Sequence, residues 1–378
     1  MAAPTGVALL GATGSIGTSA LRVLERQAAR FTPVALTAFG NLTALSEQVA
    51  RFRPKYAGLV EPPVGTPADW GRGPSCLVEA ATHPEARIVI NAVVGAAGLA
   101  ATMAALRAGK RVALANKETL VMAGGLVTAE ARAHGGELVP VDSEHSAILQ
   151  CLAGRRPEEV RRLVLTASGG PFRTWATERI AAATVEDALN HPTWRMGSKI
   201  TIDSATLANK ALEVIEAHHL FGVPYDRIDV VVHPQSIIHS FVEFVDGSVL
   251  AQMGVPSMEL PILYALTWPE RVPDSGVPSF DPVALGGLTF EAVRHEAFPM
   301  LALGISAGRA GGASPAVYNA ANEAAVATFL AGRIPFQSIA RLVRSALEAC
   351  GAMPGHSLES LQAADAAARA HVIRSVES

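Results

Sequence analysis

Two acidic segments near the middle of the chain carry side chains that could hold a divalent metal ion. Asp142 and Glu144 lie in the first segment, and Glu213 lies further along in the second. If residues 139–144 are extended, Asp142 and Glu144 point to one face, because strand side chains alternate between two faces. Carboxylate oxygens are the ligands that Mg²⁺ and Mn²⁺ prefer. The three carboxylates therefore predict a metal site; the alternative is ordinary solvated carboxylates.

The second acidic segment is predicted to lie on one helix, 203–221, which begins at Asp203 or Ser204 as its cap and ends before Gly222. Side chains three or four residues apart share one face of a helix, and this face carries Thr206, Asn209, Lys210 and Glu213. Asn209 and Lys210 could donate hydrogen bonds to an anion beside the metal. A surface ion pair between Lys210 and Glu213 is the alternative.

The amino-terminal part of the chain has the glycine pattern of a dinucleotide-binding fold. An apolar strand beginning at Val7 runs into Gly11, Gly14 and Gly17, and a helix is predicted over 19–30. In this pattern the first glycine allows a tight turn, the second lets the backbone approach a pyrophosphate, and the third lets the helix pack on the strand. The helix N-terminus then offers N–H groups to the phosphates.

The segment after the second predicted strand, 34–39, indicates which nicotinamide cofactor binds. An NAD site places a carboxylate there for the ribose 2′-hydroxyl. This chain has Gly40 and Asn41, and it has no acidic residue between Glu25 and Glu47. The missing carboxylate favours NADP, whose 2′-phosphate a carboxylate would repel.

A strand-helix-strand unit of a parallel sheet is predicted over 88–115, and it leads directly into Asn116, Lys117 and Glu118. Polar residues at the carboxyl ends of parallel strands lie where open α/β sheets bind ligands. Lysine is scarce in this chain, so a lysine at this edge suggests that a compact ammonium group is required there.

Two loops in the middle of the chain are candidates for substrate binding. Ser168 opens a Ser-Gly-Gly turn after a predicted strand, and such a turn offers backbone N–H groups and a hydroxyl to an anion, unless it is an ordinary Gly-Pro turn. The loop 189–199 holds His191, Trp194 and Met196 between turn residues. Large side chains on a loop predict a flexible lid that excludes water from a substrate; filling of a small core is the alternative.

Composition excludes several classes of protein. With 49% hydrophobic and 17% charged residues the chain is not disordered, and a net charge of −3 gives no case for binding nucleic acid or an anionic membrane. Three widely spaced cysteines and the absence of a recognisable secretion signal predict a cytoplasmic protein.

Together these motifs closely resemble the 1-deoxy-D-xylulose 5-phosphate reductoisomerase family. The matching motifs follow in order over nearly the whole chain: Gly-Ala-Thr-Gly-Ser-Ile-Gly, Ala-Asn-Lys-Glu, Val-Asp-Ser-Glu-His, Ala-Ser-Gly-Gly-Pro-Phe, His-Pro-x-Trp-x-Met-Gly, Asp-Ser-Ala-Thr-x-x-Asn-Lys-x-x-Glu and His-Pro-Gln-Ser. The resemblance implies an enzyme of the non-mevalonate isoprenoid pathway. It would rearrange 1-deoxy-D-xylulose 5-phosphate to a branched aldehyde with the help of a metal, then reduce the aldehyde with NADPH to 2-C-methyl-D-erythritol 4-phosphate. The resemblance also implies Mg²⁺, Mn²⁺ or Co²⁺, a homodimer, and inhibition by fosmidomycin.

The resemblance assigns roles to residues of this chain. The metal ligands would be Asp142, Glu144 and Glu213, and the contacts to substrate hydroxyls would come from Lys117 and Ser143. The phosphate would be bound by Ser168, Ser204, Asn209 and Lys210, with His191 nearby and Trp194 and Met196 in the lid. The contacts to NADPH would come from Thr13, Gly14, Ser15, Ile16, Gly40, Asn41, Asn116, Glu118 and Gly197. Gly40 departs from the family, because many relatives carry a basic residue there.

The predicted architecture is α/β throughout its first two domains. Residues 1–142 form a doubly wound, Rossmann-type NADPH domain, and 143–268 form a central α/β catalytic domain with the metal and phosphate site and the lid. Residues 269–290, rich in proline and glycine, form a linker, and 291–378 form a small all-α domain.

Other functions remain possible at this stage. A short-chain dehydrogenase should show Tyr-x-x-x-Lys, which is absent, and a semialdehyde dehydrogenase would need a catalytic cysteine, for which Cys151 is the one loose candidate. Another NADP-dependent dehydrogenase of a phosphorylated substrate and a dinucleotide-sensing binding protein stay open. The sensor would not need three carboxylates beside a phosphate pocket.

Overall fold

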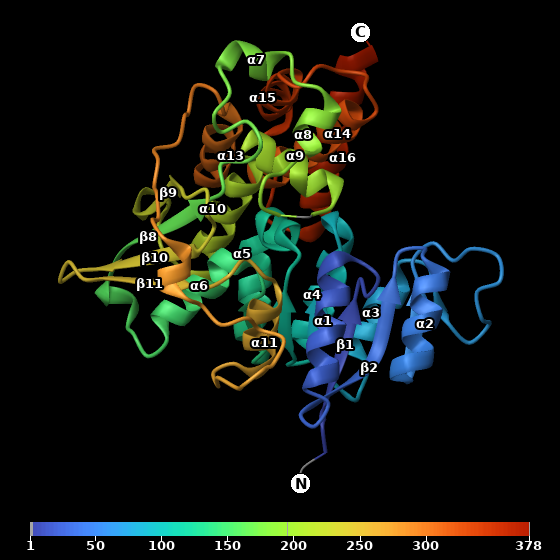
Figure 1. Cartoon of the computed structure of the whole chain (residues 1–378). Coiled ribbons are helices and arrows are strands. Elements are labelled where there is room, and N and C mark those ends of the chain that lie inside the picture. Colours follow the sequence, from blue (N-terminus) through green and yellow to red (C-terminus); the bar gives the residue numbers. More distant parts are fainter. Residues whose placement is uncertain (1–2, 195, 378) are drawn as a thin grey trace. The chain divides into compact units, whose positions relative to one another are not determined.

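The computed structural model describes residues 3–194 and 196–377, so Arg195 of the predicted lid lies outside the described residues. The chain divides into two compact units, each described separately below (Figure 1). The first unit comprises Met1–Thr119, Val127–Ala153 and Ser257–Ser279, and the second comprises Leu120–Leu126, Gly154–Pro256 and Phe280–Ser378. The domain boundaries given above remain predictions.

The first unit is built on a seven-stranded parallel sheet in the order β4-β3-β2-β1-β5-β6-β7. Its strands are β1 (Thr5–Leu10), β2 (Phe31–Ala38), β3 (Tyr56–Leu59), β4 (Gly71–Arg72), β5 (Ala86–Asn91), β6 (Arg111–Leu114) and β7 (Glu137–Pro140). The chain builds outward from β1 to β4 and then returns to continue on the other side at β5. This reversal confirms the predicted doubly wound fold, and ligands bind such sheets where the order reverses.

Helices connect these strands: α1 (Ser15–Arg26), α2 (Leu42–Phe52), α3 (Ser75–Thr82), η1 (Gly95–Ala97), α4 (Gly98–Arg107), α5 (Lys117–His134) and α6 (Ser143–Leu152). The unit also contains α11 (Glu259–Thr267), whose Ile262 and Leu266 belong to the same hydrophobic core as Val7 of β1. Arg26 of α1 fixes this late segment through an ion pair of 2.6 Å to Asp274. The first unit is therefore completed by residues 257–279, which lie in sequence between two segments of the second unit.

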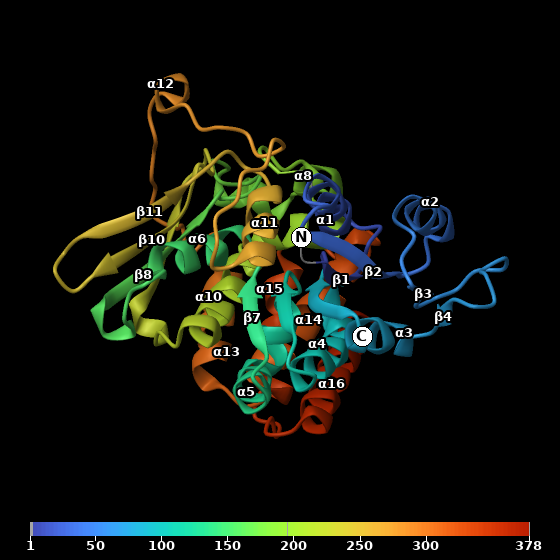
Figure 2. The same ribbon diagram turned by 90° about the horizontal axis from the view of Figure 1, so that it is seen from below.

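The second unit contains a four-stranded mixed sheet in the order β11-β10-β8-β9, as predicted for the central α/β region. Its strands are β8 (Val160–Ala167), β9 (Ile228–Val232), β10 (Ile238–Phe244) and β11 (Val249–Met253). Figure 2 shows β8, β10 and β11 side by side. β8 and β9 are parallel, so both of their carboxyl ends open at one edge of the sheet.

The second unit is otherwise helical, and its last four helices confirm the predicted helical carboxyl-terminal region. Its helices are η2 (Pro157–Glu159), α7 (Thr177–Ala181), α8 (Val185–Leu189), α9 (Ser198–Thr206), α10 (Ala208–Phe221), η3 (Tyr225–Arg227), α12 (Pro282–Leu285), α13 (Pro299–Ala310), α14 (Ser314–Leu330), α15 (Ser338–Cys350) and α16 (Leu358–Glu377). Among the residues described, no helix combines the length and apolar character that a membrane crossing requires.

The single helix predicted over 203–221 is wrong. The structure has two helices, α9 and α10, which meet at Leu207, a left-handed residue with φ of 60°. Asp203 lies inside α9 instead of capping a helix, and Thr206 ends α9, so it shares no helix with Lys210. Gly222 follows α10 as predicted, with φ of 67°. A bulky residue with positive φ is rare, so the residue types around Leu207 do not indicate this break.

The extended conformation predicted for residues 139–144 is also wrong beyond Pro140. Strand β7 ends at Pro140, and α6 begins at Ser143. Asp142 is the N-cap of α6, and its side chain accepts a hydrogen bond of 3.2 Å from the backbone N–H of Glu144. An aspartate caps a helix readily. Asp142 and Glu144 therefore lie at the start of a helix, and not on one face of a strand as predicted.

Helix α1 begins four residues earlier than predicted, at Ser15, and ends at Arg26. It follows Gly14 directly, so the fingerprint glycines lie at the start of the helix. A Cβ on Gly17 would lie 2.2 Å from the carbonyl oxygen of Gly11, which explains why this position needs glycine.

We expect Gly17→Ala to lower the free energy of unfolding by roughly 1–3 kcal/mol, because the added methyl group would strike backbone that cannot move aside. Urea denaturation measures this change. Gly125→Ala is the control, because a Cβ there meets no atom within 4 Å, and alanine favours a helix interior such as that of α5. Equal destabilisation by both substitutions would contradict the close approach inferred at Gly17.

Candidate functional site

The glycine-rich loop of the first unit connects β1 to α1 in the form that a pyrophosphate site requires. Gly11 has φ of 84°, and a Cβ on it would lie 2.6 Å from the carbonyl oxygen of Ala92. The N–H groups of Gly11 and Ala12 donate to the carbonyl oxygen of Thr37 at 3.0 and 2.7 Å, which joins the loop to the end of β2. The N-terminus of α1 follows, and it carries four predicted cofactor contacts, none of them buried: Thr13, Gly14, Ser15 and Ile16.

The other predicted cofactor residues of this unit lie at the ends of neighbouring parallel strands. Asn41 follows β2 and caps α2 by accepting a hydrogen bond of 3.1 Å from the N–H of Ala44. Asn116 follows β6, and its amide donates to the carbonyl oxygens of Val93 at 2.8 Å and Gly95 at 2.9 Å. These contacts fix the shape of the crevice edge between β5 and β6.

Asn116 and Glu118 are almost fully buried, with exposures of 1% and 5%. The Asn116 amide also donates to Glu118 at 3.0 Å, and its oxygen accepts from the N–H of Thr119. Both side chains therefore organise the start of α5.

The sequence reasoning missed Asn91, which organises the same edge. Its amide donates to the carbonyl oxygen of Gly98 at 3.0 Å and to the hydroxyl of Thr102 at 2.8 Å. Its own oxygen accepts from the N–H of Val93. The sequence does contain a signal for Asn91. It is an asparagine at the carboxyl end of an apolar parallel strand, where open α/β sheets bind their ligands.

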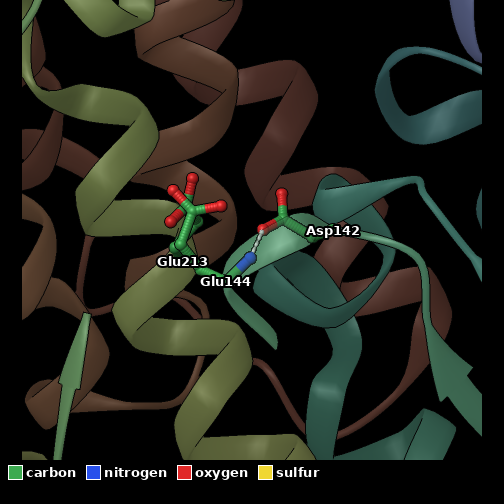
Figure 3. A group of neighbouring side chains, drawn as sticks. All are labelled: Asp142, Glu144 and Glu213. Atoms are coloured by element: carbon green, nitrogen blue, oxygen red, sulfur yellow. Dashed lines mark hydrogen bonds between the residues drawn. The ribbon is translucent and has the colours of Figure 1, made fainter. Parts of the chain in front are cut away.

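Two of the three carboxylates predicted to hold a metal, Asp142 and Glu213, are each paired with a lysine of their own unit. Lys117 at the start of α5 donates to Asp142, and Ser143 donates to Glu144 in the first turn of α6. His145 Nδ1 lies 3.4 Å from Asp142 Oδ1. Asp142 and Glu144 are half-buried carboxylates at the start of one helix, and a metal bound by them stays a prediction (Figure 3).

Glu213 is a buried carboxylate on α10 of the second unit, with 1% exposure (Figure 3). Lys210, one turn earlier, donates to one of its oxygens, and Asn209 donates to the other. A carboxylate removed from water in this way needs a compensating cation. Three of the residues predicted for metal and phosphate are thus in direct contact.

Ser168 and His191 are also brought together, although one follows β8 and the other lies on the loop after α8. His191 Nε2 lies 3.0 Å from Ser168 Oγ. His191 Nδ1 accepts from the backbone N–H groups of Thr193 at 3.1 Å and Trp194 at 2.9 Å, so the neutral ring carries its proton on Nε2 and donates to Ser168. Burial lowers the pKa of His191, which favours this neutral form.

The Ser-Gly-Gly turn after β8, residues 168–170, lies in close contact with α9. Gly169 and Gly170 have φ of 85° and 67°. A Cβ on Gly170 would lie 2.6 Å from the carbonyl oxygen of Ser204, so the turn and Ser204 are in close backbone contact. The N–H of Gly170 donates to Ser168 Oγ at 3.3 Å. The turn is therefore shaped by contact with the helix that carries another predicted phosphate ligand.

The remaining predicted site residues lie on the loop between α8 and α9. Trp194 and Met196 are half-buried, and Gly197 is exposed and caps the start of α9. Closure of this loop as a lid stays a prediction.

Comparison with known proteins covers nearly the whole chain. The family model described as 1-deoxy-D-xylulose 5-phosphate reductoisomerase matches residues 7–124, and the model of its C-terminal domain matches residues 138–221. A third model, described as the DXP reductoisomerase C-terminal domain, matches residues 253–371.

Two curated relatives carry the name 1-deoxy-D-xylulose 5-phosphate reductoisomerase and are 51% identical to this chain. The protein of Synechococcus sp. (strain JA-2-3B'a(2-13)) aligns over 374 residues, 96% of this chain and 95% of the relative. The protein of Symbiobacterium thermophilum aligns over 383 residues, 96% of this chain and 97% of the relative.

Solved structures agree with the curated relatives. The reductoisomerase from Zymomonas mobilis, in complex with NADPH, superposes with a TM-score of 0.91 at 45% identity and covers 99% of this chain and 100% of its own. A DOX-P reductoisomerase in complex with NADPH, fosmidomycin and magnesium has a TM-score of 0.93 at 39% identity, with coverage of 99% and 98%. The chain therefore belongs to the 1-deoxy-D-xylulose 5-phosphate reductoisomerase family.

Proposed function

We propose that this chain converts 1-deoxy-D-xylulose 5-phosphate to 2-C-methyl-D-erythritol 4-phosphate, using NADPH and a divalent metal ion. One observation carries the proposal beyond family membership. The second unit brings Gly170 of the turn that begins at Ser168 against the main chain of Ser204, and Asn209 and Lys210 both donate to the buried Glu213. Hydroxyl, amide and ammonium donors beside a carboxylate suit a phosphorylated substrate that also contacts a metal.

Asp142, Glu144 and Glu213 are proposed to hold the metal. Their oxygens are the ligands that Mg²⁺, Mn²⁺ and Co²⁺ accept, and Lys117 and Lys210 neutralise two of them in this structure. When bound, such an ion acts as a Lewis acid on the substrate's carbonyl and hydroxyl oxygens. A relative of known structure contains magnesium together with fosmidomycin.

The side chains around these carboxylates are proposed to position the substrate. Lys117 and Ser143, which contact Asp142 and Glu144, would donate to substrate hydroxyls. Ser168, Ser204, Asn209 and Lys210 would bind the phosphate, and His191 would hold the Ser168 hydroxyl in place through its Nε2 proton. Binding energy gained at the phosphate can orient the reacting carbonyl and close the loop carrying Trp194 and Met196 over it.

NADPH is proposed to bind at the point where the strand order of the first unit reverses. The N-terminus of α1 would hold the pyrophosphate, and NADPH supplies the hydride for the reduction. Gly40 provides no cationic side chain for the 2′-phosphate, so the N-terminus of α2 beside Asn41 is the proposed partner. The remaining contacts would come from Asn116, Glu118 and Gly197.

A homodimer is proposed through the edge of the four-stranded sheet. β11 is an edge strand, and Val249, Leu250 and Met253 on it are 53%, 39% and 37% exposed. Val245 before it and Val255 after it are also exposed. An exposed apolar edge strand is a liability for a monomer and a suitable surface for binding a second copy of the chain.

A cytoplasmic location is proposed as well, consistent with three buried cysteines that form no disulfide.

Metal dependence is the most direct test of the proposed function. We expect the protein to consume NADPH when 1-deoxy-D-xylulose 5-phosphate is added, to stop in excess chelator, and to recover with Mn²⁺ or Mg²⁺. Glu213→Gln should lower kcat by at least roughly a hundredfold and leave the NADPH Kd nearly unchanged, because the metal acts on the substrate. Full turnover in chelator would remove the metal assignment, whereas NADPH binding without turnover would favour a dinucleotide sensor.

Cofactor preference follows from the missing carboxylate after β2. We expect kcat/KM for NADPH to exceed that for NADH by about tenfold or more. Gly40→Asp should narrow this ratio by repelling the 2′-phosphate; a Cβ there would lie 3.1 Å from the carbonyl oxygen of Glu61, a close contact that needs a small shift of that backbone. Steady-state kinetics with both cofactors measure the ratio, and comparable values in the unmodified protein would show that the missing acid carries no preference.

The role of Lys210 can be separated from that of the reacting centre. A charge-assisted hydrogen bond to the phosphate contributes about 1.5–3 kcal/mol, so Lys210→Ala should lower kcat/KM by roughly ten- to a hundredfold. A substrate analogue without the phosphate is the control, since the two proteins should turn it over at similar rates. Equal damage with both substrates would place Lys210 at the reacting end or in support of Glu213.

A further inference from the structure

A buried carboxylate, Asp203, links two helices of the second unit. Asp203 lies on α9 and is 1% exposed. Its Oδ1 accepts a hydrogen bond of 2.7 Å from the Asn322 amide on α14, and its Oδ2 lies 2.9 Å from Lys199 Nζ. A buried carboxylate is tolerated only when both oxygens are compensated, so these two partners fix its position.

Asp203 occupies the point where the proposed phosphate site is assembled. Ser204, a proposed phosphate ligand, is the next residue, and its main chain contacts Gly170 of the Ser-Gly-Gly turn. Lys199 lies in the first turn of α9, two residues after the N-cap Gly197, and it is the last residue of the proposed lid, 189–199. A shift of the Asp203 side chain would therefore act on both the turn and the lid.

Asn322 is an unusual residue for its place on α14. The helix is mostly buried and rich in alanine, yet Asn322 is fully buried, and its amide oxygen has no hydrogen-bond partner among the described residues. An unsatisfied buried polar atom lowers stability, so an apolar residue would suit the fold better. The donor that Asn322 provides to Asp203 is what justifies an amide at this position.

We propose that Asn322 is a positioning residue for the substrate phosphate, acting through Asp203 on Ser204 and on the end of the lid. This inference rests on the proposed function. It gives the carboxyl-terminal helices a part in substrate binding. Without the Asn322 donor, Asp203 keeps the Lys199 ammonium as its partner among the described residues, and α9 loses the side-chain hydrogen bond that joins it to α14.

Asn319 supplies a matched control. It lies one turn earlier on α14, is equally buried, and also has an amide oxygen without a partner among the residues that the structure describes. Its amide donates to Glu323 of the same helix at 3.1 Å, so this side-chain hydrogen bond does not lead to Asp203. A purely structural role for buried amides on α14 would make the two positions respond alike.

The test compares Asn322→Leu with Asn319→Leu in the full-length protein, by kinetics and thermal unfolding. We expect Asn322→Leu to raise the KM for 1-deoxy-D-xylulose 5-phosphate by about tenfold, with the KM for NADPH changed by less than about twofold. Asn319→Leu should leave both KM values within about twofold, whatever its effect on Tm. A similar KM response in the two variants, or no rise in the substrate KM with Asn322→Leu, would overturn the proposal.

A second variant, Asn322→Asp, keeps the side-chain volume and adds a pH readout. Two carboxyl groups in contact share a proton at low pH and repel each other at high pH. We expect the substrate KM of the variant to exceed that of the wild type at pH 8. The ratio of the two KM values should return towards one at pH 6. A ratio independent of pH would count against contact between the two groups in solution.

Failure of the proposed function can be distinguished from failure of this inference, because in the first case the wild type would not consume NADPH with this substrate. In that event, calorimetric titration with fosmidomycin and with inorganic phosphate tests the inference alone. Weaker binding of either anion by Asn322→Leu than by Asn319→Leu supports it, and equal binding by the two variants overturns it.

Discussion

Carboxylates held out of water need cations, and this constraint accounts for the places where the few lysines of the chain are found. The chain has 31 basic residues, of which only five are lysines, and three of those pair with Asp142, Asp203 and Glu213. An arginine would grip such a carboxylate with two hydrogen bonds in a fixed plane. An ammonium group is a point charge on a flexible stem, so Lys117 and Lys210 neutralise a carboxylate without the fixed geometry of an arginine. This suits the proposed site, in which each lysine would turn towards the substrate once a metal bound the carboxylate.

The second constraint is the close approach of backbones in the second unit. Gly170 contacts the main chain of Ser204, and a Cβ on Gly304 of α13 would lie 2.5 Å from the Cβ of Ala211 on α10. The carboxyl-terminal helices therefore press directly on α10, which carries Lys210 and Glu213, while Asn322 of α14 holds α9. This packing supports the proposal that substitutions in these helices alter substrate binding without contacting the substrate.

Sequence reasoning located the fold and the chemistry well, because both depend on local patterns. The glycines at 11, 14 and 17 require a strand on one side and a helix on the other, and the structure has β1 and α1 there. It failed where a tertiary contact decides the backbone. Asp142 could cap a helix or continue a strand, and only the folded chain settles which. Asn322 could have been noticed as an amide in an apolar helix, but its partner Asp203 is 119 residues away and no spacing rule connects them.

The break at Leu207 shows why a strained residue can be retained near a binding site. A left-handed, non-glycine residue costs about 1–2 kcal/mol, and Leu207, 3% exposed, is kept in this conformation by its packing. A continuous helix from Asp203 to Phe221 would have placed Asn209 and Lys210 in a helix interior, where backbone N–H groups are already bonded. The break makes Ala208 the first residue of a new helix, so Asn209 and Lys210 stand in its first turn. The positive end of the α10 dipole therefore lies in the turn that carries Asn209 and Lys210, which supports the proposed binding of the phosphate by these two residues.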